Sequence, residues 1–80
     1  MDKIGEVVHF YGDINVAVLA LDEPLSIGDT VTFRRGEEDL FEQKIASMEV
    51  DEVSVEAVSA GDEVAVKVSE QAKAGTEVYR

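Results

Sequence analysis

Apolar residues fall in short runs along the chain, and polar residues rich in Gly, Asp and Asn separate the runs. The runs are rich in Val and too short for stable isolated helices, which is typical of β-strands. The pattern therefore predicts an all-β protein. We expect six strands, over Ile4–Phe10, Asn15–Leu21, Thr30–Arg35, Leu40–Val50, Glu63–Val68 and Thr76–Tyr79.

Two of these strands have features beyond simple alternation. Asn15–Leu21 is apolar on both faces, so we expect the core to cover one face and a loop or a partner to cover the other. Leu40–Val50 changes the parity of its apolar positions between Ile45 and Met48. A β-bulge near Ser47 would turn both halves of the strand toward the core.

Two segments give weaker signals. Asp51–Ser59 is acidic with isolated valines, and we expect an irregular loop with a short extended piece. Glu70–Lys73 is the one segment where a helical turn is plausible. Neither segment provides a helix of useful length, so the all-β prediction stands.

The strands are expected to close into a single domain, residues 1–80. An open sheet would leave long unpaired edges, and closing it into a small six-stranded antiparallel β-barrel removes them. A chain of this size buries only roughly 60% of its unfolded surface. It has no Cys and a single His, so disulfides and thiolate metal sites cannot brace the core.

One turn pattern occurs three times. Ser26–Val31 matches Ser59–Val64, and Lys73–Val78 is a looser third copy. In each copy Gly suits a positive φ, the next side chain can bond the turn, and a Val then enters the core. The predicted structural turn residues are Gly28, Asp29, Gly61, Asp62 and Gly75.

Charge is the strongest compositional signal. Eighteen Asp and Glu against seven Lys and Arg give a net charge of −11, although 45% of the residues are apolar, which argues against disorder. Such a field disfavours direct binding to nucleic acids or anionic membranes. With only four Lys, the acidic surface also suits a high-salt cytoplasm, where screening removes self-repulsion.

The order of these motifs resembles the β-barrel that follows the GTPase domain in translation factors such as elongation factor Tu. Ile4–Val8 resembles its opening strand, and Leu25–Val31 its characteristic turn. Val55–Val64 resembles its later half, and Gly75–Val78 the start of its last strand. The run Phe41–Met48 is similar to that of small stand-alone elongation-factor-like proteins.

The resemblance implies a translation-protein barrel that contacts proteins or ribonucleoproteins. The chain lacks the Gly-x-x-x-x-Gly-Lys-Ser/Thr phosphate loop, so it cannot be a GTPase by itself. Family contact residues cannot be matched one by one, and only the turn positions carry over.

Few residues suggest chemistry. His9 has no Cys or nucleophile-elbow Ser to act with, and we expect it on a strand face. The acidic groups Glu37–Asp39 and Asp51–Glu52 lack the spacing of a calcium loop and are expected to be solvated turn carboxylates. We therefore predict no enzyme activity, no metal and no cofactor.

Arg34 and Arg35 form the one adjacent basic pair and are the predicted partner contact. The alternative is that Arg34 pairs with acids on a neighbouring strand. The aromatic residues are expected to pack in the core and at the barrel ends rather than to stack on bases. They are Phe10, Tyr11, Phe33, Phe41 and Tyr79.

The sequence thus predicts a monomeric, cytoplasmic, non-enzymatic interaction module, possessing neither a signal peptide nor a membrane span. Its partner would be a protein or a ribonucleoprotein. The alternative is a detached accessory domain of a metabolic or proteolytic enzyme system, because the fold alone does not determine the pathway.

Overall fold

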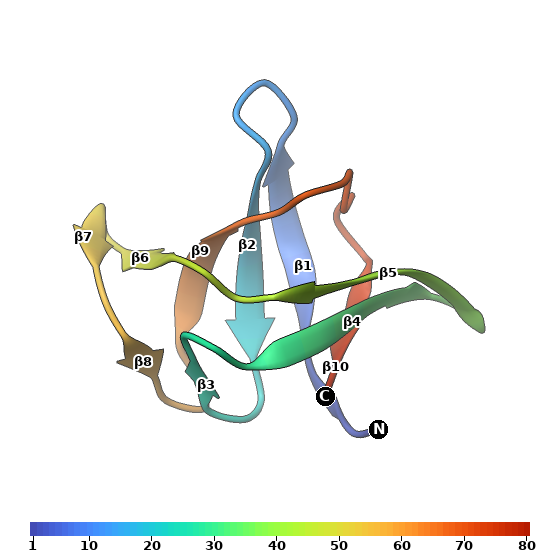
Figure 1. The fold of residues 1–80 in the computed structure, drawn as a ribbon, viewed down its shortest axis with the longest axis horizontal. Helices are drawn as coiled ribbons and strands as arrows, with labels where there is room; N and C mark the ends of the chain where they lie inside the picture. The colour runs from blue at the N-terminus through green and yellow to red at the C-terminus, as the bar shows by residue number, and fades with distance from the viewer.

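The computed structural model describes residues 1–80 and contains strands and turns but no helix (Figure 1). This confirms the predicted all-β class. The ten strands are β1 (Lys3–Tyr11), β2 (Val16–Leu21), β3 (Leu25–Ser26), β4 (Thr30–Arg35), β5 (Glu38–Lys44), β6 (Met48–Val50), β7 (Val53–Ser54), β8 (Ala57–Val58), β9 (Glu63–Lys67) and β10 (Glu77–Tyr79).

Eight strands form one antiparallel sheet in the order β5-β4-β10-β1-β2-β9-β6-β7, and β3 pairs with β8 separately. The hydrogen-bonded ladder is open, because its outer strands β5 and β7 are not neighbours. The predicted six-stranded closed barrel is therefore wrong in strand number, and a closed ladder is not observed. Two-residue strands such as β3 and β8 are too short to leave a periodic signal in the sequence.

The core lies on the inner face of this curved sheet. It comprises seventeen buried hydrophobic residues, and each fully buried aliphatic or aromatic side chain contributes about 1.5–3 kcal/mol of transfer free energy. Phe33 of β4 stacks on Phe41 of β5 with ring centroids 4.6 Å apart. Alternation accounts for most of the pattern, since Ala17, Leu19 and Leu21 of β2 all point inward.

The predicted strand over Leu40–Val50 is two strands. β5 ends at Lys44 and β6 begins at Met48, so the chain breaks near Ser47 where a bulge was expected. Ile45 in the break is still buried, at 1% exposure. A break satisfies the same need as a bulge, because it returns Met48 to the core after the change of parity.

The predicted helical turn at Glu70–Lys73 is not formed, since this segment is irregular. Ala72 within it is completely buried against the core, which anchors the segment without helical hydrogen bonds. The expected loop Asp51–Ser59 contains β7 and β8 as its short extended pieces.

Strand β1 crosses the sheet with a change of register between Val7 and His9. Val7 is fully buried, whereas the neighbouring Val8 is exposed. Gly5 in the same strand runs close to β2. A Cβ atom there would lie 3.2 Å from the Cα of Leu21 and well inside contact distance of the Ala20 carbonyl oxygen, so only Gly fits.

The two ends of the chain lie side by side (Figure 1). The amide of Asp2 donates to the carbonyl of Arg80 at 2.8 Å, and the amide of Arg80 donates back at 2.9 Å. Lys3 Nζ also lies 3.4 Å from the carboxylate of Glu77 in β10, and this contact raises the pKa of Lys3. Since the chain forms no helix, it has none with the length and apolar character to cross a membrane.

Candidate functional site

The predicted turn residues build two nearly identical corners. Gly28 and Gly61 have φ angles of 97° and 91°, a conformation that strains any residue with a Cβ. In each corner an aspartate carboxylate accepts a 2.9 Å hydrogen bond from a serine amide three residues earlier, Asp29 from Ser26 and Asp62 from Ser59. These contacts make the corners structural elements that start β4 and β9.

The third copy of the turn keeps the glycine but not the aspartate. Gly75 has a φ of 94°, and Thr76 stands in the aspartate position. The Thr76 amide donates to the carbonyl of Lys73 at 3.0 Å, and its hydroxyl accepts from Arg35 at 3.4 Å. This corner therefore connects the start of β10 to β4.

Arg34 and Arg35 point in opposite directions, as consecutive strand residues do. Arg34 Nε lies 3.0 Å from the carboxylate of Asp39 on β5, and its guanidinium lies over the Tyr79 ring, 5.3 Å from the centroid. The Asp39 contact is an ion pair without hydrogen-bond alignment. Arg34 thus has an acidic neighbour on the adjacent strand, which was the alternative to a partner contact.

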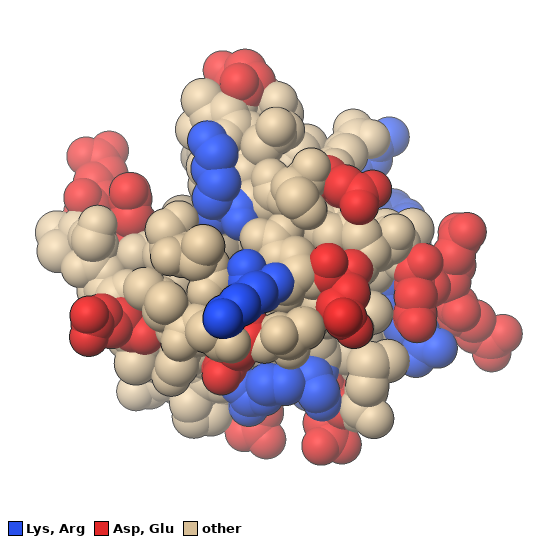
Figure 2. Space-filling view, in the orientation of Figure 1, with Lys and Arg blue, Asp and Glu red and all other residues tan.

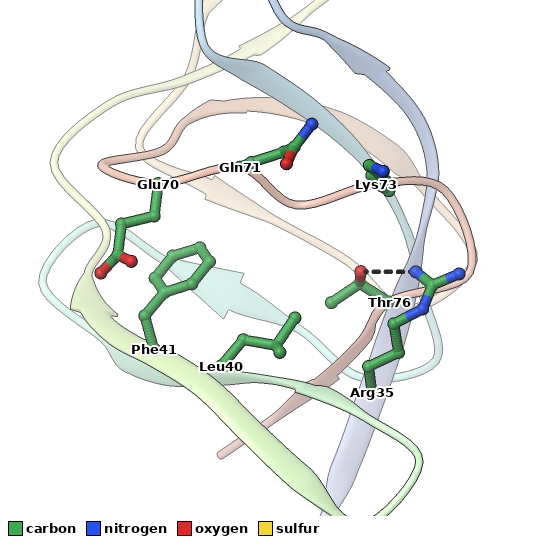
Figure 3. Close-up of a pocket in the computed structure, with 7 residues that line it drawn as sticks. All are labelled: Arg35, Leu40, Phe41, Glu70, Gln71, Lys73 and Thr76. Carbon is green, nitrogen blue, oxygen red and sulfur yellow. Dashed lines mark hydrogen bonds between the residues drawn. The ribbon is translucent and has the colours of Figure 1, made fainter.

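Arg35 lies at one end of a surface pocket (Figure 3). Its guanidinium donates weak 3.4 Å hydrogen bonds to the Ala74 carbonyl and the Thr76 hydroxyl. Leu40 and Phe41 line one side, and the close-up shows Glu70 at the end opposite Arg35. The pocket has a volume of about 450 Å³, and its charges of both signs are exposed to solvent.

Two further hollows adjoin one another and share no lining residue with the Arg35 pocket, and we call them together the β2–β9 groove. Their volumes are about 510 and 270 Å³, and they share Ile14, Val16, Glu49 and Ala65. The groove lies between the β1–β2 hairpin and the β6–β7 hairpin, which project as separate arms in Figure 1. Unlike the Arg35 pocket, the larger hollow is lined mainly by hydrophobic residues.

The remaining predicted residues lie apart from one another. His9 is exposed on β1, and its ring packs on Tyr11 with centroids 4.2 Å apart. Tyr11 is 46% exposed at the end of β1, so of the two places expected for the aromatic residues, the core and the barrel ends, it does not occupy the core. No group of three or more His, Asp or Glu side chains is arranged to hold a metal ion.

The charged side chains are unevenly distributed. Asp and Glu lie at the two ends of the long axis and at the tip of the β1–β2 hairpin, and further acidic groups lie right of the centre and along the lower edge, whereas several of the fewer Lys and Arg lie near the middle of the face shown (Figure 2). The ends correspond to the β4–β5 turn with Glu37 and Glu38, and to the β6–β7 turn with Asp51 and Glu52. The acidic β6–β7 turn therefore borders the β2–β9 groove.

The chain is similar in sequence to part of one curated protein. No family model matches the chain. An uncharacterized protease of Methanocaldococcus jannaschii is 34% identical over 77 residues, which cover 96% of this chain but 19% of that protein. The chain thus spans about a fifth of the length of this curated relative.

Two solved structures share the fold. Both are of the C-terminal domain of a predicted U32 peptidase from Geobacillus thermoleovorans. The selenomethionine variant superposes with a TM-score of 0.90 over 100% of both chains, and the second structure with 0.88 over 98% of this chain and 90% of that chain. Both are 20% identical to this chain, so the likeness is one of fold.

These matches overturn the resemblance to elongation factor Tu and the translation role it implied. The motifs behind it were glycine–aspartate corners and Val-rich strands. Such features start strands in any small β-domain, so they report the fold rather than the family. The Asp29 and Asp62 corners illustrate this, because their hydrogen bonds are purely local.

Proposed function

We propose that this chain is a non-catalytic accessory domain of a protease of the U32 peptidase type, and that it acts by binding protein. The observation that carries the proposal is the alignment of 96% of the chain with a portion of the M. jannaschii protease. The likeness in fold to the C-terminal domain of a predicted U32 peptidase supports the same role. It is the proteolytic form of the alternative expected from the sequence, a detached accessory domain of a metabolic or proteolytic enzyme system.

The chemistry of the chain agrees with a binding role. The chain has no Cys, and its one imidazole packs on Tyr11 in an exposed position. The cation-containing pocket at Arg35 and the β2–β9 groove are both open surface features suited to contact with another polypeptide. Catalysis is assigned to the remainder of the protease, and this chain contributes recognition.

We also propose that the sheet, whose hydrogen-bonded ladder is open, is closed into a barrel by other contacts. Although the ladder is open, Gln43 of β5 reaches the far side of the gap and bonds to Lys67 and Ser69 at the end of β9. At the other end, β3 and β8 pair, and the Ile27 amide donates to the Glu56 carbonyl at 3.0 Å. We infer that these links hold the sheet as a closed barrel in solution, with the cytoplasm as its expected location.

A chimera tests the accessory role. The 77 matched residues of the M. jannaschii protease are deleted and then replaced by this chain, and hydrolysis of fluorescent casein is followed. We expect the deletion to raise KM with a smaller effect on kcat, and this chain to restore KM, because uniform substrate binding is what an accessory domain supplies.

The matched control is this chain alone, which should not hydrolyse casein. Hydrolysis by the isolated chain, or a deletion that leaves both kinetic constants unchanged, would contradict the proposal. A deletion that unfolds the remainder is recognised by its circular dichroism, and binding of casein by this chain alone then decides the question.

A further inference from the structure

Strand β2 has an apolar outer face that the rest of the chain covers only in part. Its inward residues are buried, whereas Val16, Val18 and Ala20 alternate with them and remain partly exposed. A sheet face open to water normally carries polar side chains. The sequence predicted that a loop or a partner covers this face, and the structure leaves it partly open to solvent between the β1–β2 and β6–β7 turns.

The ladder register shows that this apolar face continues onto β9 and is flanked by polar residues on β1 and β6. Residues that oppose one another in a ladder share a face of the sheet. One row runs across β1, β2, β9 and β6 through His9, Val18, Ala65 and Glu49.

A second row joins Tyr11, Val16 and Lys67. Ile14 at the hairpin tip is 52% exposed and completes an apolar surface with Tyr11 at one end of the β2–β9 groove. Contiguous apolar surface with a polar rim is typical of an interaction site.

The rim of the groove is acidic. Glu49, Asp51, Glu52 and Glu63 line the larger hollow, and Lys67 is the one cation that lines the smaller one. None of these four carboxylates takes part in the three ion pairs of the structure. They are therefore free to pair with cations from outside the chain, at an edge of an apolar surface that excludes water.

The backbone at this rim holds its acids in an unfavourable conformation. Asp51 and Glu52 have φ angles of 51° and 66° in the two-residue turn between β6 and β7. Left-handed conformations cost roughly 1–2 kcal/mol for residues with a Cβ, and Asn-Gly is the usual choice for such a turn. Two acidic residues occupy positions where Gly would have a lower conformational free energy, which is consistent with a role in binding.

We propose that the β2–β9 groove binds a polypeptide segment whose apolar side chains are flanked by Lys or Arg. The aliphatic side chains would pack on Val16, Val18 and Ala65, and the cations would lie against the rim carboxylates. This deepens the proposed function, on which it rests, by naming the surface and the chemistry of the protein that the accessory domain recognises.

The acidic rim favours a basic peptide segment over a second copy of the chain, a nucleic acid or an anionic lipid. A second copy of the chain would bring Glu49, Asp51, Glu52 and Glu63 against an identical acidic rim, and like charges facing each other are repulsive. Nucleic acid and anionic lipid are disfavoured for the same reason, given the net charge of −11. A segment that is both apolar and basic matches the apolar residues Val16, Val18 and Ala65, which form the floor of the groove, and the carboxylates of its rim.

NMR titration of the chain with synthetic peptides tests the proposal. The probe peptide has about eight residues, roughly 26 Å when extended, with Val and Leu at its centre and two Lys at each end. One control peptide replaces Val and Leu by Gly and Ser, and a second replaces Lys by Glu. We expect the probe alone to shift the amide resonances of Val16, Val18 and Ala65 strongly, and those of Leu40 and Phe41 in the other pocket to stay unchanged.

Two variants separate the floor from the rim. Val18→Lys should abolish the binding, and replacing Glu49 and Glu63 by Gln should weaken it about 2- to 10-fold and reduce its salt dependence. Thermal unfolding checks that each variant is folded. Glu37→Gln together with Glu38→Gln removes the same charge away from the groove and should leave the affinity nearly unchanged.

Several results would overturn the inference. They are equal binding of the Gly and Ser peptide, shifts confined to the Arg35 pocket, no binding at millimolar peptide, and self-association of the free chain through the groove. Each of these leaves the chimera experiment intact, so failure of the groove and failure of the accessory role are distinguishable.

Discussion

The side chain of Gln43 on β5 makes hydrogen bonds with the backbone near Ser69 that a neighbouring strand would otherwise make. Its Nε2 donates to the Lys67 carbonyl at 2.7 Å, while its Oε1 accepts from the Ser69 amide at 2.8 Å. One amide group thus makes a donor and an acceptor contact with backbone groups, as a neighbouring strand would. The link lies where the ladder itself is missing.

Replacing Gln43 by Ala should therefore lower the free energy of unfolding by about 1 kcal/mol, because two hydrogen bonds to solvent-exposed backbone groups are lost together. Urea unfolding measures the change, and hydrogen exchange should accelerate at Ser69. The matched control is Gln71→Ala, an exposed Gln for which we expect less than about 0.5 kcal/mol. Equal effects of the two substitutions would show that Gln43 is not a structural link.

The two aspartate corners provide an internal comparison. Asp62→Ala removes one turn hydrogen bond and should cost about 1 kcal/mol of unfolding free energy. Asp29→Ala removes the same bond and also the 3.0 Å ion pair with Arg80, so it should cost about 0.2–1 kcal/mol more. In an Arg80→Ala background the two costs should become equal in chemical denaturation, and a persistent difference would argue against the ion pair as its cause.

Gly5→Ala should destabilise the fold by about 1–3 kcal/mol, because the added methyl group collides with the β2 backbone rather than with a movable side chain. Thermal or urea unfolding provides the measurement. Gly12→Ala is the matched control, since a Cβ there meets the Phe10 side chain at an ordinary 3.5 Å. If both variants unfold alike, the close approach of β1 and β2 is not the constraint.

Replacing Asp51 and Glu52 together by Asn and Gly should raise the free energy of unfolding by about 1 kcal/mol, because the strained turn becomes a favoured one. The same variant should bind the Lys-flanked peptide more weakly. Glu37→Gly removes an acid from a turn without positive φ at that residue and should bring no gain. A gain from Glu37→Gly as well would attribute the effect to lost charge rather than to relieved strain.

The melting temperature should rise as sodium chloride increases to molar concentration, because the Debye length falls to about 3 Å and the −11 charge no longer repels itself. Differential scanning calorimetry measures the slope. Replacing Glu37, Glu38 and Glu70 by Gln should flatten it. A melting temperature that is independent of salt would end the suggestion of a high-salt habitat.

Alternation and glycine corners were sufficient to place the long strands. β2, β4 and β9 begin and end within a residue or so of their predicted bounds, because one buried face leaves a clear period of two. The irregularity near Ser47 was predicted as a bulge and is a break between two strands. The β3–β8 pair was not predicted, since it depends on contacts between distant segments. Gly5 gave a usable signal, a glycine inside a strand, that was not recognised.

The groove was only half predictable. The doubly apolar character of Asn15–Leu21 indicated an outer face that needs a cover. The sequence could not show that Tyr11 and Ile14 would flank it on one side and Asp51 and Glu52 on the other, because sheet order brings these hairpins together. Arg34 and Arg35 were predicted to act as a pair because they are adjacent in sequence, although consecutive residues of a strand lie on opposite faces.

The paired hydrogen bonds between Asp2 and Arg80 have a practical consequence for engineering. Because its two ends are adjacent, the chain could be inserted into an exposed loop of another protein, and the two ends of that loop would have to move apart very little. Joining the ends with a short linker and reopening the chain at Gly12 should likewise yield a circular permutant with the same topology.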